Sequence, residues 1–449
     1  MPYVPHSDQD RRAMLDAIGV RSLEDLFSDV PERARFPELD LPPGGSEIEV
    51  RRELEDLAAN NLTVEDMPSF LGAGAGHHFV PAVVNAVISR GEFATSYTPY
   101  QPEISQGTLQ AIFEYQTMIC ALTGMEVSNA SHYDGATSTA EAVITALNLH
   151  RGKRHKVILS PYLHPEYREV VRTYTQGIEL TIVGDGRKDP RDLASLLDDD
   201  TTCVVVQYPN FHGRIEDFSD LADKVHAAGA YLIVVANPIA LGLLKPPGEF
   251  GADIVVGEGQ PLGLGLNFGG PYLGFFATRE EFVRKMAGRL VGQTVDAEGK
   301  RGFVLTLSTR EQHIRRDKAT SNICSNQSLL ALAAAVYMTA MGPCGLRQVA
   351  ELCYHRAHYA AEQINLLKGY EVETDTLFFN EFVVHCPIPV NELNAILLDE
   401  YGIIGGYEMD WDDSNAEYDM LLAVTEMVSR EDIDRLVEAL DETAEEEDW

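Results

Sequence analysis

The chain has 449 residues, of which 45% are hydrophobic, and this predicts a globular protein with two or three folding units. Its 35 lysines and arginines are outnumbered by 70 aspartates and glutamates, so the formal net charge is −35. This excess of negative charge argues against a surface for nucleic acid or anionic membranes. Only nine of the cations are lysines, and such an acidic surface suits a salt-rich cytoplasm.

The sequence has no stretch typical of a membrane anchor or an export signal. The longest apolar runs, such as residues 329–338, are too short to cross a bilayer, and the first ten residues lack a basic and then an apolar region. The six cysteines are scattered without metal-ligand spacing, which predicts reduced structural thiols and no metal site. We therefore expect a cytoplasmic protein.

Residues 1–65 are predicted to form a helical arm. Its two helical segments begin at serine N-caps, Ser7 and Ser46, and the first segment stops at Gly19. The proline-rich stretch between them is expected to be extended. An arm of this kind usually packs on a partner or on the main body.

Two motifs follow the arm. His77 and His78 are adjacent after a glycine-rich turn, which is poor spacing for binding one metal ion and favours a loop or interface. Residues 97–110 hold two tyrosines and two prolines in a stiff loop, with Ser105 as the cap of the next helix. This pattern fits a protein interface and a ligand-binding wall equally well.

A second site candidate lies at the start of a long helix. Gly135, Thr137 and Ser138 bring backbone N–H groups and hydroxyls to one place. The pattern is typical of a phosphate site and also of an ordinary N-cap, and the residues alone favour neither.

From residue 154 to residue 278, apolar strands alternate with helices. Strands are expected at residues 156–160, 180–183, 203–207, 231–235, 253–256 and 272–277. Such apolar strands separated by helices predict a largely parallel sheet, buried on both faces, with a ligand-facing edge at the strand carboxyl ends. The glycine-rich stretch 251–274 includes one of these strands and is where an α/β enzyme builds an active site.

The pattern changes to a smaller α/β unit beyond a helix at residues 326–341. We expect a large α/β domain at 66–342, a joint at 343–345 and a small C-terminal α/β domain at 343–449. The elements predicted in the small domain are helices at 346–367, 391–399 and 429–440, and strands at 370–374, 382–385 and 421–424.

This arrangement resembles the aspartate-aminotransferase-like fold, the fold type I of transferases that depend on pyridoxal phosphate (PLP). Four motifs in order, at residues 97–107, 134–142, 235–244 and 309–324, are similar to the N-terminal half of the glycine cleavage system P-protein family. In many prokaryotes that half is a separate chain, which works with a second chain, subunit 2.

The resemblance implies a cytoplasmic oxidoreductase of glycine catabolism, which decarboxylates glycine through PLP and passes the aminomethyl group to the lipoyl group of the H-protein. It also implies a heterotetramer, a dimer of heterodimers with subunit 2. The chemistry requires a Schiff-base lysine and an acid at the pyridinium nitrogen. At the matching positions this sequence has Gln260 and Ala236, so PLP is expected on subunit 2 and no covalent catalyst is expected here.

The resemblance moves the candidate site residues to the loop that reaches the partner's active site. The main candidates are Tyr97, Tyr100, Glu103 and Ser105, and the weaker ones are Thr320, Ser321 and Asn322. Packing at a subunit interface is the alternative role for all of them.

Two other functions stay open from the residues. One is a self-sufficient PLP-dependent lyase or transferase that uses Lys245 or Lys318. The other is a non-catalytic scaffold or regulatory pseudoenzyme.

Overall fold

The computed structural model describes residues 5–186, 190–307, 315–316, 319, 321, 323, 325–373, 376–409 and 416–446. It divides into two compact units, Met1–Leu62 and Thr63–Trp449.

The first unit contains the predicted helical arm. Helix α1 (Asp8–Ile18) begins at Ser7 in a capping box and ends at Gly19, which has φ 86°. Helix α2 (Glu47–Ala58) begins in a second capping box at Ser46, so both serine caps are confirmed. Two short 3-10 helices, η1 (Glu24–Phe27) and η2 (Glu32–Ala34), lie between them. Within the described unit no residue of α1 or α2 is buried, so its stability rests on local caps.

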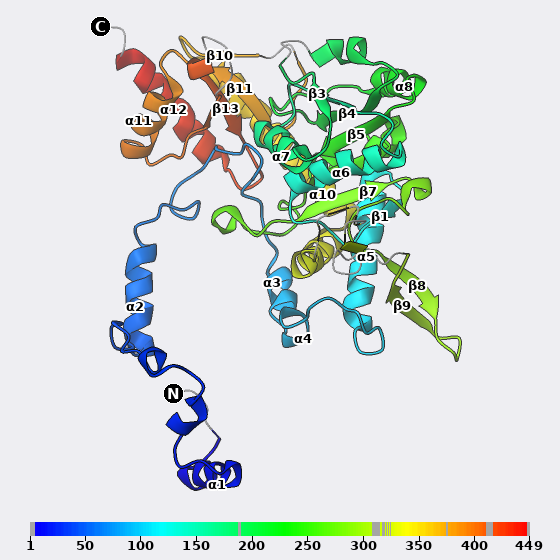
Figure 1. Ribbon diagram of the computed structural model, residues 1–449. Coiled ribbons are helices and arrows are strands. Elements are labelled where there is room, and N and C mark those ends of the chain that lie inside the picture. The colour runs from blue at the N-terminus through cyan, green and yellow to red at the C-terminus, as the bar shows by residue number, and fades with distance from the viewer. Residues whose placement is uncertain are drawn as a thin grey trace. The chain divides into compact units, whose positions relative to one another are not determined.

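The second unit holds the remaining helices and all the strands (Figure 1). Its α-helices are α3 (Ala82–Ile88), α4 (Gly91–Ala94), α5 (Gln106–Thr123), α6 (Gly135–Leu149), α7 (Pro165–Thr175), α8 (Ser219–Ala227), α10 (Ser328–Ile364), α11 (Val390–Asp399) and α12 (Arg430–Glu446). Its strands are β1 (Val127–Ser128), β2 (Lys156–Leu159), β3 (Thr181–Val183), β4 (Thr201–Tyr208), β5 (Tyr231–Ala236), β6 (Ile254–Glu258), β7 (Gly274–Thr278), β8 (Val291–Val295), β9 (Arg301–Leu305), β10 (Glu371–Val372), β11 (Glu381–His385), β12 (Tyr407–Glu408) and β13 (Asp419–Ala423).

A seven-stranded sheet forms the centre of this unit. Its strand order is β1-β7-β6-β5-β4-β2-β3. Strands β2 to β6 pair in parallel, and β7 runs antiparallel to both β6 and β1. The prediction of a largely parallel sheet is therefore confirmed, with each of the six predicted strands present within two residues of its expected ends.

The sheet is buried on both faces because alternate residues of each strand enter different cores. In β5, Leu232 and Val234 belong to the core shared with α5, α8 and α10, whereas Ile233 and Val235 belong to the core under α6 and α7. All four are nearly inaccessible to water. Full burial of one such side chain contributes about 1.5–3 kcal/mol, which explains why this apolar run forms a central strand.

A smaller sheet of order β10-β11-β13-β12 is antiparallel throughout and has a core of its own. Helix α10 joins the two cores: its side chains up to Cys353 pack in the first core, and those from Ala357 pack in the second. The helix bends at Gly342 (φ 61°, ψ 178°), next to Pro343. The boundaries predicted for the large and small domains remain a proposal.

Helix α10 is also the one described helix that is long and apolar enough to cross a membrane. Length and composition alone are weak grounds for a membrane span, since core helices of soluble proteins also satisfy them. Tyr337 and Ala350, for example, are fully buried in the protein core.

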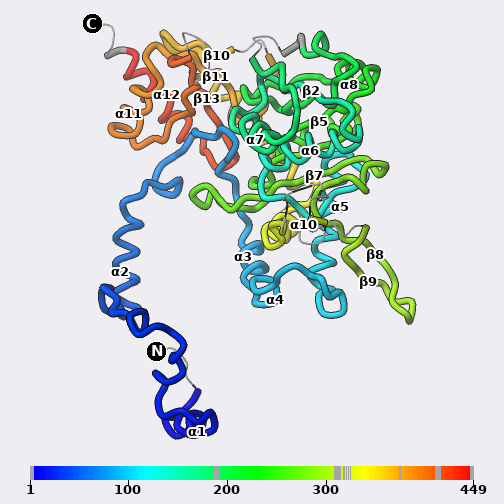
Figure 2. The backbone as a smooth tube through the Cα atoms, viewed as in Figure 1, coloured from blue at the N-terminus to red at the C-terminus, as the bar shows by residue number. Residues whose placement is uncertain are grey.

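Strands β8 and β9 form an antiparallel hairpin that extends from the body of the unit (Figures 1 and 2). The sequence reading missed it because its strands mix polar and apolar residues. Val291 at its base and Phe303 in its middle are buried against α5, while Val295 near its tip is 64% exposed.

Candidate functional site

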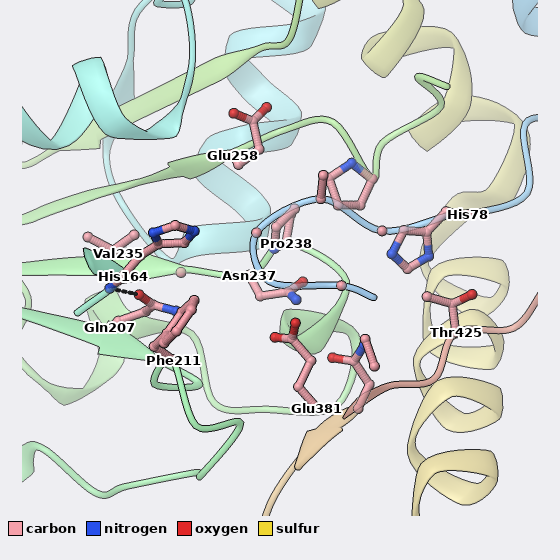
Figure 3. A pocket seen from close by; sticks show the side chains of 18 of the residues that line it. His78, His164, Gln207, Phe211, Val235, Asn237, Pro238, Glu258, Glu381 and Thr425 are labelled. Carbon is pink, nitrogen blue, oxygen red and sulfur yellow. Dashed lines mark hydrogen bonds between the residues drawn. The ribbon is translucent and has the colours of Figure 1, made fainter. Parts of the chain in front are cut away.

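A small cavity lies at the carboxyl ends of β4, β5 and β6, where the sheet topology predicts a ligand site (Figure 3). Its volume is about 80 Å³. In Figure 3, His164 and Gln207 lie on one side of the cavity, and His78 and Thr425 lie on the other. Among the residues that line it there is no lysine.

Ala236 is the last residue of β5, lines the cavity and is buried. The next side chain, Asn237, also lines the cavity, but its Oδ1 accepts a hydrogen bond of 2.9 Å from the N–H of Ile239. Asn237 therefore stabilises the turn after β5. Neither residue supplies a carboxylate at the end of this strand.

Gln260 is fully buried two residues after the end of β6. Its Nε2 donates hydrogen bonds of 3.0 Å to the carbonyls of Gly76 and Leu264. Its Oε1 accepts a hydrogen bond of 3.2 Å from the N–H of Gly76. The amide thus ties the loop after β6 to the glycine-rich loop at residues 71–76.

The carboxyl group of Glu258, at the end of β6, lies at the start of α6. Its Oε2 accepts from the N–H of Gly135 at 3.0 Å, and its Oε1 accepts from the N–H groups of Gln260 (2.9 Å) and Leu273 (3.0 Å). Burial raises the pKa of Glu258 to about 7, although the three N–H donors oppose that shift. The sequence reading missed this residue because a single glutamate in a glycine-rich loop carries no recognisable pattern.

The predicted phosphate-site residues form the first turn of α6. Thr137 takes part in a capping box with Asp134, whose carboxylate accepts from the Thr137 N–H at 2.7 Å. The Ser138 hydroxyl donates to the Asp134 carbonyl at 2.7 Å. A Cβ at Gly135 would lie 2.3 Å from the Tyr167 hydroxyl oxygen, so this position requires glycine.

Two further ionisable residues of the cavity hold the loop at residues 71–76 by its backbone. The Nε2 of His164 lies 3.0 Å from the carbonyl of Ala73, and Oε1 of Glu381 accepts from the Ala73 N–H at 2.9 Å. Burial lowers the pKa of His164 and raises that of Glu381, which favours their neutral forms. Sequence reasoning did not find either residue, because they come from elements far apart in the chain.

The loop at residues 97–105 is open to solvent and does not line the cavity. Tyr97 is 75% exposed, and Glu103 is also exposed. Tyr100 is 52% exposed, and the buried Arg289 donates a hydrogen bond of 3.1 Å to its hydroxyl. Ser105 holds the N-cap position of α5, but its side chain makes no capping hydrogen bond, so the expectation of a serine cap was wrong in that detail.

The remaining candidates are described only in part. The Ser321 hydroxyl accepts from the N–H of Ile323 at 3.1 Å, and Thr320 and Asn322 lie outside the described residues. Lys245 is exposed and does not line the cavity. Lys318 lies outside the described residues.

The chain is similar to known proteins over nearly its whole length. A model of the glycine cleavage system P-protein family matches residues 1–440. The probable glycine dehydrogenase (decarboxylating) subunit 1 of Thermomicrobium roseum is 57% identical over 447 residues, which cover 98% of this chain and 99% of that protein. A protein of the same description from Bacillus cytotoxicus is 52% identical over 440 residues, covering 97% and 98%.

Solved structures agree with these relatives. A crystal structure of glycine decarboxylase (P-protein) in inhibitor-bound form has a TM-score of 0.89 at 46% identity and covers 98% of this chain and 100% of its own. A sphingosine-1-phosphate lyase of Burkholderia pseudomallei has a TM-score of 0.64 at 15% identity, covering 93% and 94%. This second likeness concerns the fold alone. Taken together with the P-protein structure, it confirms the predicted PLP-transferase fold of type I. The chain therefore belongs to the glycine cleavage system P-protein family, in the form of subunit 1 of glycine dehydrogenase (decarboxylating).

Proposed function

We propose that this chain and a second subunit decarboxylate glycine together, with PLP held by the second subunit. The aminomethyl group then passes to the lipoyl group of the H-protein. Bound PLP supplies the electron sink for decarboxylation. The role of this chain is to complete and position the active site of its partner.

The observation that carries the proposal is Gln260. A Schiff base requires an amine, and the side chain at this position is an amide that is fully buried and hydrogen-bonded to Gly76 and Leu264. The amide therefore holds two loops together where the fold would otherwise hold a cofactor.

The surroundings of Gln260 do not fit PLP either. The carboxyl group of Glu258 already accepts from the first N–H of α6, the donor that a cofactor phosphate would need. The cavity of about 80 Å³ is several-fold smaller than the roughly 300–1,000 Å³ of ordinary ligand sites. Ala236 has no carboxylate to pair with a pyridinium nitrogen.

The test measures PLP binding and glycine decarboxylation for each subunit alone and for the two together. The chain alone, subunit 2 alone and the mixture are supplied with PLP and with glycine labelled at its carboxyl carbon. We expect PLP on subunit 2, and carbon dioxide release in the presence of H-protein only from the mixture. PLP recovered on a peptide of this chain after borohydride reduction would overturn the proposal, and a peptide containing Lys245 or Lys318 would identify the self-sufficient alternative.

We further propose that the loop at residues 97–105 reaches the partner's active site, and that Thr320, Ser321 and Asn322 are weaker candidates for the same role. The exposure of Tyr97 and Glu103 supports this, because exposed polar tips on a proline-stiffened loop are available to a partner. In the assembled complex, Glu103→Gln is expected to lower glycine turnover while assembly persists. Unchanged turnover would favour the non-catalytic scaffold.

The assembly we propose is a dimer of heterodimers in the cytoplasm. The net charge of −35 supports a salt-rich setting, since mobile ions screen the self-repulsion of such a surface. Light scattering of the purified complex at low and high salt tests both the proposed stoichiometry and the proposed dependence on salt. We expect a mass equal to two copies of each subunit, and dissociation at low salt.

A further inference from the structure

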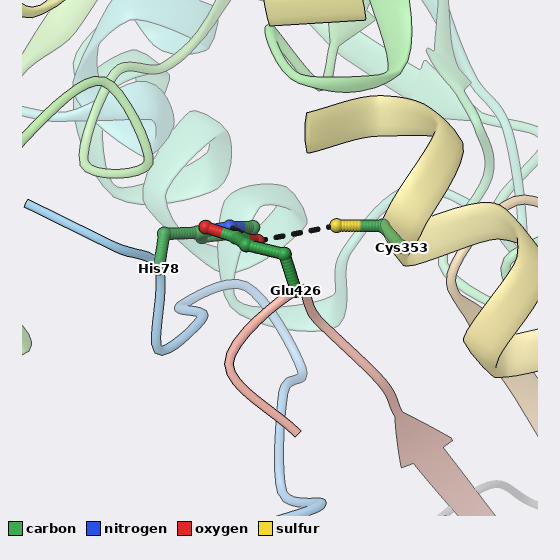
Figure 4. Close-up of side chains that lie close together, drawn as sticks. All are labelled: His78, Cys353 and Glu426. Atoms are coloured by element: carbon green, nitrogen blue, oxygen red, sulfur yellow. Dashed lines mark hydrogen bonds and ion pairs between the residues drawn. The ribbon is translucent and has the colours of Figure 1, made fainter. Parts of the chain in front are cut away.

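Three side chains with metal-binding atoms meet beside the cavity (Figure 4). His78 comes from the loop before α3, Cys353 from α10 and Glu426 from the segment after β13. The Nδ1 of His78 lies 2.8 Å from Oε2 of Glu426, and Sγ of Cys353 lies 3.3 Å from the same oxygen. All the ligand atoms lie within 4.8 Å of one another.

The cluster is shielded from water and held in place by its surroundings. The side chains of His78 and Glu426 are 5% and 6% exposed, and Cys353 is fully buried. The N–H of Phe79 donates to Oε1 of Glu426 at 2.8 Å, and Arg356 donates to the Glu426 carbonyl at 2.6 Å. Ligands that are fixed in this way lose little freedom when an ion binds.

Cys353 does not have the surroundings of a catalytic nucleophile. Burial and the adjacent Glu426 carboxylate raise the pKa of its thiol well above the usual range, whereas reactive cysteines have a lowered pKa. Burial opposes the ionised form of Glu426 as well, but the hydrogen bond from His78 lowers the pKa of that carboxyl to about 2. Glu426 thus contributes a carboxylate oxygen that lies within reach of both His78 and Cys353.

We propose that His78, Cys353 and Glu426 form a binding site for a zinc ion. Thiolate, imidazole and carboxylate are the donors that zinc prefers, and three protein ligands leave one position for water or a small anion. Zinc–ligand bonds of about 2.0–2.3 Å put tetrahedral donor atoms roughly 3.3–3.6 Å apart, within the range that the cluster spans. Of the three ligands, His78 also lines the cavity.

The charges balance when the ion binds. A bond forms between the ion and the sulfur of Cys353, the S–H bond breaks, and the proton leaves to the solvent. The neutral imidazole of His78 binds the ion through Nδ1 and keeps its single proton on Nε2, so the hydrogen bond between Nδ1 and Glu426 is replaced by the two bonds to the ion. The thiolate and the Glu426 carboxylate together neutralise the divalent cation, so the buried complex carries no net charge. The site departs from the expectation, based on cysteine spacing, that this chain binds no metal.

The ion would link three segments at the point where the two cores of the unit meet. Cys353 is the last buried residue of α10 in the first core, and Ala357 is the first buried residue in the second core. Glu426 follows β13 of the small sheet, and His78 precedes α3. The zinc ion would thus hold these three segments together, and the proposal does not depend on the proposed division of PLP between subunits.

The test uses the tag-free full-length chain after treatment with a chelator. Zinc and, as its coloured substitute, cobalt are titrated into the chain while bound metal and released protons are measured. We expect one ion per chain, proton release from the thiol, and a cobalt spectrum with a thiolate charge-transfer band. Cys353→Ser is expected to remove that band and to weaken binding at least 100-fold, and Cys386→Ser, a change at another buried cysteine, is expected to leave both unchanged.

Glu426→Gln provides a second variant if Cys353→Ser fails to fold, and circular dichroism checks each one. Glu426→Gln is expected to weaken zinc binding at least 10-fold and to retain the cobalt–thiolate band at saturation. The proposal is overturned if the wild-type chain shows no saturable binding, which would leave a hydrogen-bonded triad only. Equal binding by wild-type and Cys353→Ser chains would overturn it as well.

Discussion

The cavity at the end of β6 and the loop at residues 97–105 differ in how their polar groups are used. At the cavity, the fully buried Gln260 beside it and the half-buried Glu258 in its wall make their hydrogen bonds within the chain. In the loop, Tyr97 and Glu103 point polar groups into solvent. Polar groups engaged internally contribute to stability, and exposed ones are free for a partner. Substitutions in the two regions should therefore affect different properties.

The largest expected effect on stability is that of Gln260→Leu. The variant removes the partner of the half-buried N–H and carbonyl of Gly76 and of the buried carbonyl of Leu264, which costs about 4 kcal/mol of unfolding free energy. Urea denaturation measures it, and Gln176→Leu at an exposed position is the control. A loss below about 1 kcal/mol would contradict a locking role for Gln260.

The next effect is the pH dependence that Glu258 contributes. Its pKa is about 7 in the folded chain and near 4.5 when unfolded, so the folded state binds the proton more tightly. Relative to Glu258→Gln, the unfolding free energy of the wild type should fall by about 3 kcal/mol as the pH rises from 4.5 to above 7. Denaturation at a series of pH values tests this, with the exposed Glu249→Gln as control. Parallel curves for the wild type and Glu258→Gln would be inconsistent with a raised pKa.

A smaller difference in unfolding free energy is expected between the N-caps of α6, beside the cavity, and α5, after the loop at residues 97–105. Asp134→Ala should cost about 1–2 kcal/mol, because its carboxylate caps α6 at Thr137. Ser105→Ala should cost no more than about 0.3 kcal/mol, because the serine makes no side-chain cap on α5. Thermal unfolding of both variants measures the difference, and equal losses would show that α5 depends on its cap after all.

Tyr97→Phe is expected to have a small effect on stability and a marked effect on activity. The hydroxyl is on a side chain that is 75% exposed, so its removal should change the unfolding free energy by less than about 0.5 kcal/mol. If the loop serves the partner's active site, glycine turnover of the complex should fall about 10-fold. Full turnover with normal assembly would limit Tyr97 to interface packing, and Tyr174→Phe, outside this loop, is the control.

The sequence was informative wherever local pattern determines structure. Apolar runs identified the strands of the large sheet, and the serine caps identified α1 and α2. Gln260 was singled out because the family resemblance implies a Schiff-base lysine at its position, and the structure adds the partners of its amide.

What the sequence could not reveal depends on contacts between distant segments. His78, Cys353 and Glu426 have no common spacing, and the fold alone brings them together. Glu258 gains its partner because β6 ends beside α6, which no local pattern encodes. The β8–β9 hairpin was not predicted because its strands mix polar and apolar residues and its tip is exposed.

Helix α10 ties the two cores into one cooperative structure. The same rigid element supplies Ala350 to one core and Ala360 to the other, so neither core can open far without straining the other. Native-state hydrogen exchange should therefore find the amides at the centre of both sheets opening together, in one global event. Helix α10 changes direction at Gly342, but we expect the two cores to unfold together and not as separate parts.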